Sequence, residues 1–271
     1  MRVLVLSVPE SEAELAADRL WTAGARAVEQ IDDGSGTTVL RTVLAGTDAV
    51  SSGRLGELGA GWKVAFVDVD DAPAQTWREF AKQIAVNADV VIRPAWLAPQ
   101  RPMSGVEIEI EPGGSFGLGD HPTTRMCADA TWRLTKAGDR VLDVGCGSGV
   151  LSIIAALRGA DHVVAIDIAE AAREATDDNA RRNRVSDRIS ASTTRIADVD
   201  GAFDLVVANL LAPTLITMAG DLSRLVAPEG RLLVSGVLAG LHDHVLAALT
   251  PLRHVDTVEL DGWAAVELRH H

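Results

Sequence analysis

A glycine-rich segment and a later aspartate are the residues whose types and spacing could do chemistry in this sequence. Residues 140–149 read RVLDVGCGSG, and Asp167 stands 22 positions after Gly145. Glycines have no Cβ and let a backbone approach a ligand closely, while an aspartate at the end of the next strand can accept hydrogen bonds from both ribose hydroxyls of a nucleoside. We therefore predict a nucleoside-binding loop built on Gly145, Gly147 and Gly149.

The spacing of these glycines argues against a dinucleotide site. It is G-x-G-x-G rather than G-x-G-x-x-G, and no Lys-Ser/Thr pair follows as in a P-loop. Asp143, two residues before Gly145, would repel a pyrophosphate but attract the ammonium of an amino-acid moiety. With Asp143 and Asp167 in place, the segment resembles the D-x-G-x-G-x-G signature of class I methyltransferases, which implies S-adenosylmethionine as the cofactor. The alternative is a tight turn that binds nothing.

The elements around this loop predict an α/β domain. Apolar residues at 141–144 are typical of a buried parallel strand, and residues 150–157 follow as a helix. Further strands are expected at residues 106–111, 162–168, 188–193, 203–208, 230–235, 255–260 and 264–268, with helices at 169–182, 215–225 and 242–249. The alternation predicts a seven-stranded, Rossmann-like class I methyltransferase domain. Asn209 follows a central strand, at the edge where such sheets bind ligands.

The first 70 residues predict a smaller domain of a different kind. Strands are expected at residues 3–8, 27–31, 37–44 and 62–69, with helices at 11–21 and 48–58. This βαββαβ order predicts an α+β ferredoxin-like domain. It contains no nucleophile–base pair, so we expect domain 1–70 to recognise the substrate. Residues 71–102 are proline-punctuated and are expected to form a semi-rigid linker, followed by the methyltransferase domain at 103–271.

A second glycine-rich stretch precedes the catalytic sheet. Residues 112–124 read PGGSFGLGDHPTT, and four glycines so close together do not form a regular helix or strand. A helix is expected from Pro122, with Asp120 or His121 as its cap. We predict that this stretch covers the cofactor as a lid, and the alternative is a simple helix cap. His121 is the only histidine in these motifs and is a candidate proton shuttle.

Composition narrows the class of protein. The chain has 271 residues with a formal net charge of −13, which argues against direct nucleic-acid binding and is compatible with a basic protein partner. Its two cysteines, Cys127 and Cys146, form no disulfide framework, and we predict no metal site. No apolar run approaches the length of a membrane span, and the N-terminal segment lacks signal-peptide features. We therefore expect a cytoplasmic protein without membrane association.

Three motifs make the resemblance specific to one family of methyltransferases. Residues 117–124 (GLGDHPTT), 143–149 (DVGCGSG) and 209–212 (NLLA) are similar to those of the bacterial ribosomal protein L11 methyltransferase family. Leu118 departs from the threonine usual in that family, and Pro213 from a common glycine. The resemblance implies methylation of lysine or N-terminal amines of the large-subunit ribosomal protein L11.

The resemblance also implies roles for single residues. The positions that match the family's cofactor contacts are Thr124, Gly145, Asp167 and Asn209. A lysine amine, with a pKa of about 10.4, must lose its proton before it can attack a methyl group. Burial beside a cationic sulfonium favours the neutral amine, and the Asn209 carbonyl could accept its N–H bonds and orient its lone pair. Asn209 cannot act as a general base.

Other functions remain compatible with the motifs. The chain could methylate lysines of a different protein, or a small molecule, although a small substrate would not require domain 1–70. A non-catalytic binding module would be expected to have lost Asp143, Asp167 or Asn209, and all three are present. A nicotinamide dehydrogenase is the weakest alternative and would be stabilised against heat by a different cofactor.

Overall fold

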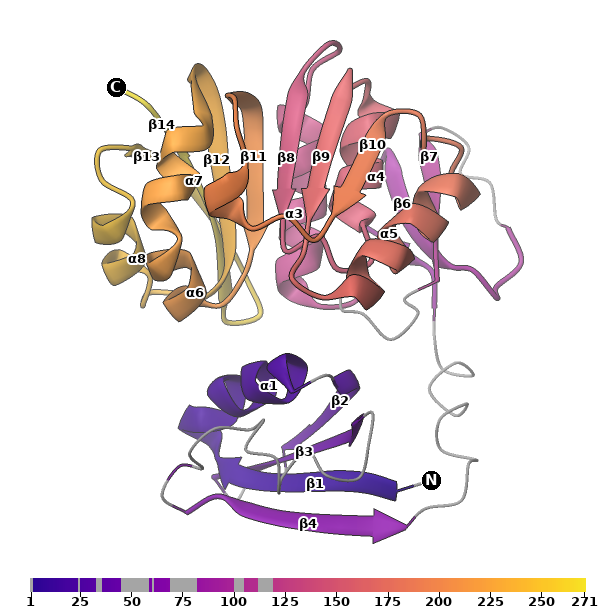
Figure 1. The fold of residues 1–271 in the computed structure, drawn as a ribbon, viewed down its shortest axis with the longest axis vertical. Coiled ribbons are helices and arrows are strands. Elements are labelled where there is room, and N and C mark those ends of the chain that lie inside the picture. The colour runs from indigo at the N-terminus through magenta and orange to yellow at the C-terminus, as the bar shows by residue number, and fades with distance from the viewer. Residues whose placement is uncertain are drawn as a thin grey trace. The chain divides into compact units, whose positions relative to one another are not determined.

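The structure, a computed structural model, describes residues 2–23, 25–32, 36–44, 59, 61–68, 82–99, 105–111 and 119–271. The chain divides into two compact units, Met1–Ala81 and Lys82–His271. Figure 1 labels the helices and strands of both. The helix predicted at residues 48–58 and most of the predicted lid, residues 112–118, fall outside the described residues.

The first unit contains a four-stranded antiparallel sheet with the order β2-β3-β1-β4. Alternation along β1 places Leu4, Leu6 and Val8 on one face, where they are buried together with Ala16 and Leu20 of α1. One face of this sheet therefore forms the core of the unit. Its elements are β1 (Arg2–Pro9), the 3₁₀ turn η1 (Glu10–Glu12), α1 (Ala13–Thr22), β2 (Ala25–Asp32), β3 (Thr37–Leu44) and β4 (Lys63–Asp68).

The second unit is built on the predicted seven-stranded sheet, which the structure confirms (Figure 1). Its order is β10-β9-β8-β11-β12-β14-β13, and all neighbours are parallel except the pairs that involve β14. The strands are β8 (Arg140–Val144), β9 (His162–Ile166), β10 (Ile189–Ser192), β11 (Phe203–Asn209), β12 (Val226–Leu238), β13 (Arg253–Leu260) and β14 (Trp263–Arg269).

Helices cover both faces of this sheet, which explains why its central strands are almost continuously apolar. Val141 of β8 packs in one core cluster with α3 and α4, whereas Leu142 and Val144 pack in the other with α6, α7 and α8. The helical elements are α3 (Pro122–Leu134), α4 (Val150–Arg158), α5 (Glu170–Arg182), the 3₁₀ turn η2 (Ile196–Asp198), α6 (Ala212–Thr217), α7 (Ala219–Leu225) and α8 (Asp243–Ala248).

One predicted helix is two helices in the structure. The expected helix 215–225 begins earlier, at Ala212, because Pro213 occupies the first turn of α6, where a missing N–H has no cost. Met218 then ends α6 and precedes α7. Among the described residues, no helix is both long and apolar enough to span a membrane.

Residues 82–99, which the sequence assigned to the linker 71–102, belong to the second unit. They form β5 (Ile84–Ala85) and β6 (Val90–Pro94), which join β7 (Val106–Ile110) in a separate three-stranded sheet. The predicted strand 106–111 thus lies in this sheet and not in the main one.

Arg93 explains why this small sheet is cohesive. Its side chain is buried, its Nε lies 2.8 Å from Glu107 Oε1, and its Nη2 lies 2.8 Å from Glu109 Oε2. Both partners are on β7, which pairs in parallel with β6. A buried guanidinium with two carboxylate partners is compensated, so the proline-rich stretch is held in place by charge as well as by strand pairing.

Candidate functional site

The predicted site residues converge at one edge of the main sheet. β9, β8 and β11 are adjacent parallel strands, so their carboxyl ends lie side by side (Figure 1). Gly145 follows β8, Asp167 follows β9, and Asn209 is the last residue of β11. The structure therefore brings together residues that are up to 64 positions apart in the chain.

The glycine loop turns sharply as it leaves β8. The backbone N–H groups of Gly145 and Cys146 both donate to the carbonyl oxygen of Ile166, at 2.8 and 3.1 Å. Gly145 has a φ of +75°, and a Cβ on it would lie 2.5 Å from Leu210 Cδ2. Gly149 has a φ of +78°, and a Cβ there would lie 2.9 Å from an oxygen of Thr176. Both positions require glycine for conformation and for space.

Asp167 supports the loop and keeps capacity for a ligand. It is half-buried; its Oδ2 accepts from the Gly147 N–H at 3.1 Å, and its Oδ1 accepts from the Ala169 N–H at 2.9 Å. A carboxylate offers about four lone-pair sites. Two of these remain for further donors, which is what recognition of a ribose diol requires.

Asp143 is buried and bonded to the helix that follows the loop. Its Oδ2 accepts from both the backbone N–H and the hydroxyl of Ser152, at 3.1 and 2.6 Å. Ser152 lies in the first turn of α4, where an acidic group is favoured by the unsatisfied N–H groups. Burial raises the pKa of Asp143 to about 6, the Ser152 bonds oppose that rise, and the charge of Asp167 adds to it. The predicted contact between Asp143 and an ammonium stays a prediction.

Thr124 and His121 occupy the start of α3. Thr124 is buried, and its Oγ1 has no hydrogen-bond partner in the described part of the chain; a buried hydroxyl without a partner fits a ligand. His121 caps the helix, since its Nδ1 accepts from the Thr123 N–H at 3.4 Å and its ring meets that of Trp263 edge-on. Burial lowers the pKa of His121, and Asp120 partly opposes this. The proton-shuttle role of His121 stays a prediction.

Asn209 presents a polar group at the centre of this edge. It is half-buried and pairs with Ser235 of β12 through the backbone register. Its carboxamide makes no hydrogen bond to another described residue. A carbonyl oxygen so placed can accept an N–H bond from an incoming amine.

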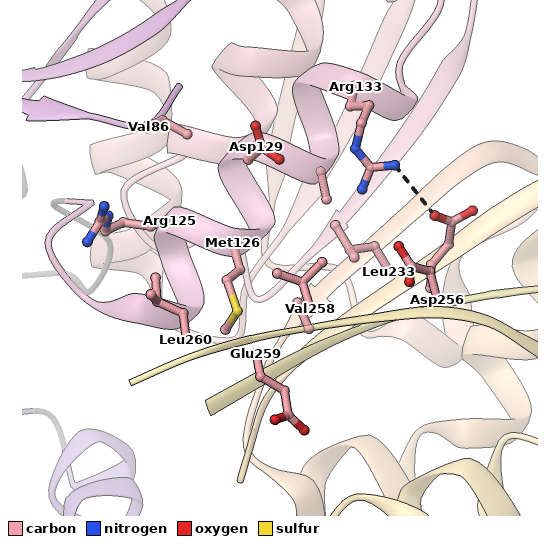
Figure 2. Close-up of a pocket in the computed structure, with 13 residues that line it drawn as sticks. Val86, Arg125, Met126, Asp129, Arg133, Leu233, Asp256, Val258, Glu259 and Leu260 are labelled. Atoms are coloured by element: carbon pink, nitrogen blue, oxygen red, sulfur yellow. Dashed lines mark ion pairs between the residues drawn. The ribbon is translucent and has the colours of Figure 1, made fainter. Parts of the chain in front are cut away.

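A cavity of about 160 Å³ lies elsewhere, between α3 and the strands β13 and β14 (Figure 2). Arg125, Met126 and Arg133 of α3 line it, opposite Val258 and Leu260 of β13, and none of the predicted site residues does. The cavity therefore is not the place where the glycine loop, Asp167 and Asn209 meet. The chemistry of the residues, and not this cavity, locates the site.

Sequence reasoning missed the side chains that support the site. Ser152 holds Asp143, Trp263 packs against His121, and the inner face of α5 reaches the glycine loop through Thr176 and Asn179. The sequence predicted only a helix at residues 169–182, with charged side chains on one face. The signal on its other face was a threonine and an asparagine among alanines, since small residues indicate close packing and leave the two polar groups in need of partners.

Comparison with known proteins identifies relatives of this chain. The family described as Ribosomal protein L11 methyltransferase (PrmA) matches residues 54–271. A ribosomal protein L11 methyltransferase from Geobacter sp. (strain M21) is 40% identical over 202 residues, 72% of this chain and 66% of the relative. One from Geotalea daltonii is 35% identical over 215 residues, 74% of this chain and 68% of the relative. The matched region thus spans about two thirds of these relatives' length.

A solved structure gives the same relationship. The crystal structure of a ribosomal protein L11 methylase from Lactobacillus delbrueckii subsp. bulgaricus superposes with a TM-score of 0.66 at 30% identity. The match covers 70% of this chain and 100% of that one.

Replacing Asp143 with asparagine should change how stability depends on pH. Because the pKa of the buried carboxyl is raised to about 6, the folded state binds its proton more tightly than the unfolded state does. The free energy of unfolding of the wild type therefore falls as the pH rises from about 4 to about 6. The variant lacks this loss and should gain about 2 kcal/mol relative to the wild type over that range. Urea unfolding at several pH values measures the difference, and a pH-independent difference would contradict the prediction.

Proposed function

This chain belongs to the ribosomal protein L11 methyltransferase family, and on that premise we propose that it methylates amines of ribosomal protein L11 with S-adenosylmethionine. The observation that carries the proposal is the meeting of the glycine loop, Asp167 and Asn209 at the carboxyl edge of β8, β9 and β11. The family match supports the choice of cofactor and of substrate.

The residues at this edge fit S-adenosylmethionine. Asp167 has acceptor capacity for the ribose hydroxyls, and the buried hydroxyl of Thr124 needs a partner. Gly145 and Gly149 allow the loop to turn with positive φ and to pack against Leu210 and Thr176, where a Cβ would clash. Burial is the main cause that raises the pKa of Asp143, and the negative charge of Asp167 adds to it; a cationic ligand beside these two carboxyl groups would stabilise their charged forms. When bound, S-adenosylmethionine supplies a methyl group already activated by a positive sulfur.

The protein's part in the reaction is to position a neutral amine. The Asn209 carbonyl would accept one N–H bond and direct the lone pair of the nitrogen toward the methyl carbon. A cationic neighbour and partial burial both disfavour the protonated amine, so the neutral form is favoured in the site. We assign no general base. His121 stays a candidate for carrying the proton away.

We propose that the first unit is a ferredoxin-like domain that recognises the substrate protein. The order β2-β3-β1-β4 supports this, because a βαββαβ chain with its first and third strands central has that order. The proposal keeps residues 1–70 as the recognition domain and adds residues 82–99 to the methyltransferase part. The net charge of −13 supports a basic protein partner without direct nucleic-acid contact, and a ribosomal substrate supports a cytoplasmic location.

The direct test is incubation of the purified protein with S-adenosylmethionine and ribosomal protein L11, followed by mass spectrometry. We expect mass gains in steps of one methyl group on lysine or N-terminal amines of L11. If L11 stayed unmodified and another protein were methylated, the proposed reaction would stand and the proposed substrate would be wrong. Unmodified protein throughout would contradict the proposed function.

Asp167→Ala should weaken binding of S-adenosylmethionine by about 1.5–3 kcal/mol, because hydrogen bonds to a charged group are lost. Titration calorimetry on the folded variant measures this. Asp161→Ala is the matched control, since it removes an exposed carboxylate just before the opposite end of β9. Unchanged affinity in Asp167→Ala, or an equal loss in the control, would show that Asp167 does not bind the cofactor.

Asn209→Ala should lower turnover by about 100-fold, the scale of a misplaced reacting group. Its melting temperature should stay close to that of the wild type, because the side chain is only half-buried and makes no hydrogen bond to another described residue. Methyl transfer to L11 at saturating cofactor and thermal unfolding are the two measurements. Turnover within a few-fold of the wild type would rule out the orienting role.

A shortened chain of residues 82–271 should bind S-adenosylmethionine as the full chain does, yet lose most methyl transfer to L11. Remote contacts with a protein substrate serve to orient its reacting amine, and removal of the first unit would remove them. The sequence alone placed the start of this domain at residue 103, but a cut there would delete β6 and Arg93, which pair with β7. A shortened chain that folds and methylates L11 at the normal rate would disprove substrate docking by the first unit.

A further inference from the structure

Two asparagines, Asn179 in α5 and Asn183 at its C-cap, form hydrogen bonds with backbone groups along the unpaired edge of β7 and the residue that follows it. Asn179 Oδ1 accepts from the Glu111 N–H and its Nδ2 donates to the Glu111 carbonyl, both at 2.9 Å. Asn183, one turn later, makes the same two bonds to Glu109. Its Oδ1 accepts from the Glu109 N–H at 2.9 Å, and its Nδ2 donates to the Glu109 carbonyl at 2.7 Å. β7 is an edge strand of its three-stranded sheet. The two carboxamides thus satisfy backbone groups for which the sheet provides no partner strand.

Only Asn179 also reaches the glycine loop. Its Nδ2 donates a second bond, at 2.9 Å, to the carbonyl oxygen of Ser148, and the residue is fully buried. The Nδ2 of Asn183 instead donates its second bond to the backbone carbonyl of Asn179, at 2.8 Å. Thr176, one turn before Asn179, donates to the Gly147 carbonyl at 3.2 Å. The inner face of α5 therefore holds two successive carbonyls of the loop.

These bonds determine how the peptide planes of the loop are oriented. A trans peptide is planar, so anchoring a carbonyl also fixes the direction of the next N–H group, which points the opposite way. The bond to Ser148 therefore orients the peptide between Ser148 and Gly149. Asparagine suits the position because its carboxamide offers one acceptor and two donors, and Asn179 uses all three.

We propose that Asn179 is a positioning residue for the cofactor loop: by holding the Ser148 carbonyl against β7, it sets the affinity for S-adenosylmethionine. The inference rests on the proposed function, since it takes the glycine loop as the cofactor site. Asn183 makes the equivalent contact with β7 but does not touch the loop, so its role is confined to the small sheet.

The pair of asparagines supplies its own matched control in the full-length chain. Asn179→Asp and Asn183→Asp each keep the oxygen that accepts from β7, lose the donors, and add the same charge. Asn179→Asp should weaken S-adenosylmethionine binding by about tenfold, the scale of one lost hydrogen bond. It should raise the KM for S-adenosylmethionine with little change in kcat. Asn183→Asp should leave binding within about twofold even where it lowers the melting temperature. Equal effects on binding, or none in folded Asn179→Asp, would overturn the proposal.

Hydrogen exchange in the wild type tests the same idea without relying on a variant that folds. S-adenosylhomocysteine should slow exchange of the Glu111 amide, which Asn179 holds, by about tenfold, a typical coupling between linked sites. The Glu109 amide, which Asn183 holds, should change much less. Equal protection of both amides, or of neither, would overturn the proposal. A wild type that binds no S-adenosylmethionine would instead disprove the proposed function, and with it the inference.

Discussion

Two hydrogen bonds to one carbonyl oxygen organise the second unit. The N–H groups of Gly145 and Cys146 both donate to Ile166, which ties the exit of β8 to the end of β9. Because Asp167 is the next residue, the same contact brings its carboxylate to the Gly147 N–H. The turn, the start of α4 and the acidic tip of β9 are thus one connected structure, and displacing any part would displace the ligand-facing groups together.

The negative charges around this turn make the site prefer a cationic ligand to an anionic one. Asp143 is buried beneath it, bonded to Ser152, and the charge of Asp167 helps to raise its pKa. Two neighbouring carboxylates, one of them buried, make the region unfavourable for a phosphate and favourable for a cation. A cofactor with a sulfonium and an ammonium satisfies that preference without a metal ion, and a pyrophosphate cofactor does not.

Helix α5 has two faces with different tasks. Its outer face carries ion pairs such as that of Arg173 with Glu170 and Asp177, which are partly exposed and contribute little stability. Its inner face is packed with alanines and carries Thr176 and Asn179, whose hydrogen bonds reach the glycine loop. The buried polar groups matter more, because a buried donor without a partner costs more than an exposed pair contributes.

The sequence by itself determined the central motif, the seven strands of the main sheet and the family, which the comparisons confirm. These features are local, because apolar runs reveal strands and the spacing of Gly145, Gly147 and Gly149 reveals the turn. Only the tertiary structure revealed the small three-stranded sheet. Arg93 of β6 pairs with two glutamates of β7, which are distant in the sequence, and the prolines around β6 had indicated a linker. Asn179 likewise meets partners 31 and 68 positions away. No local pattern encodes such contacts, because a buried carboxamide acquires its role only when the folded chain brings unpaired backbone groups to it.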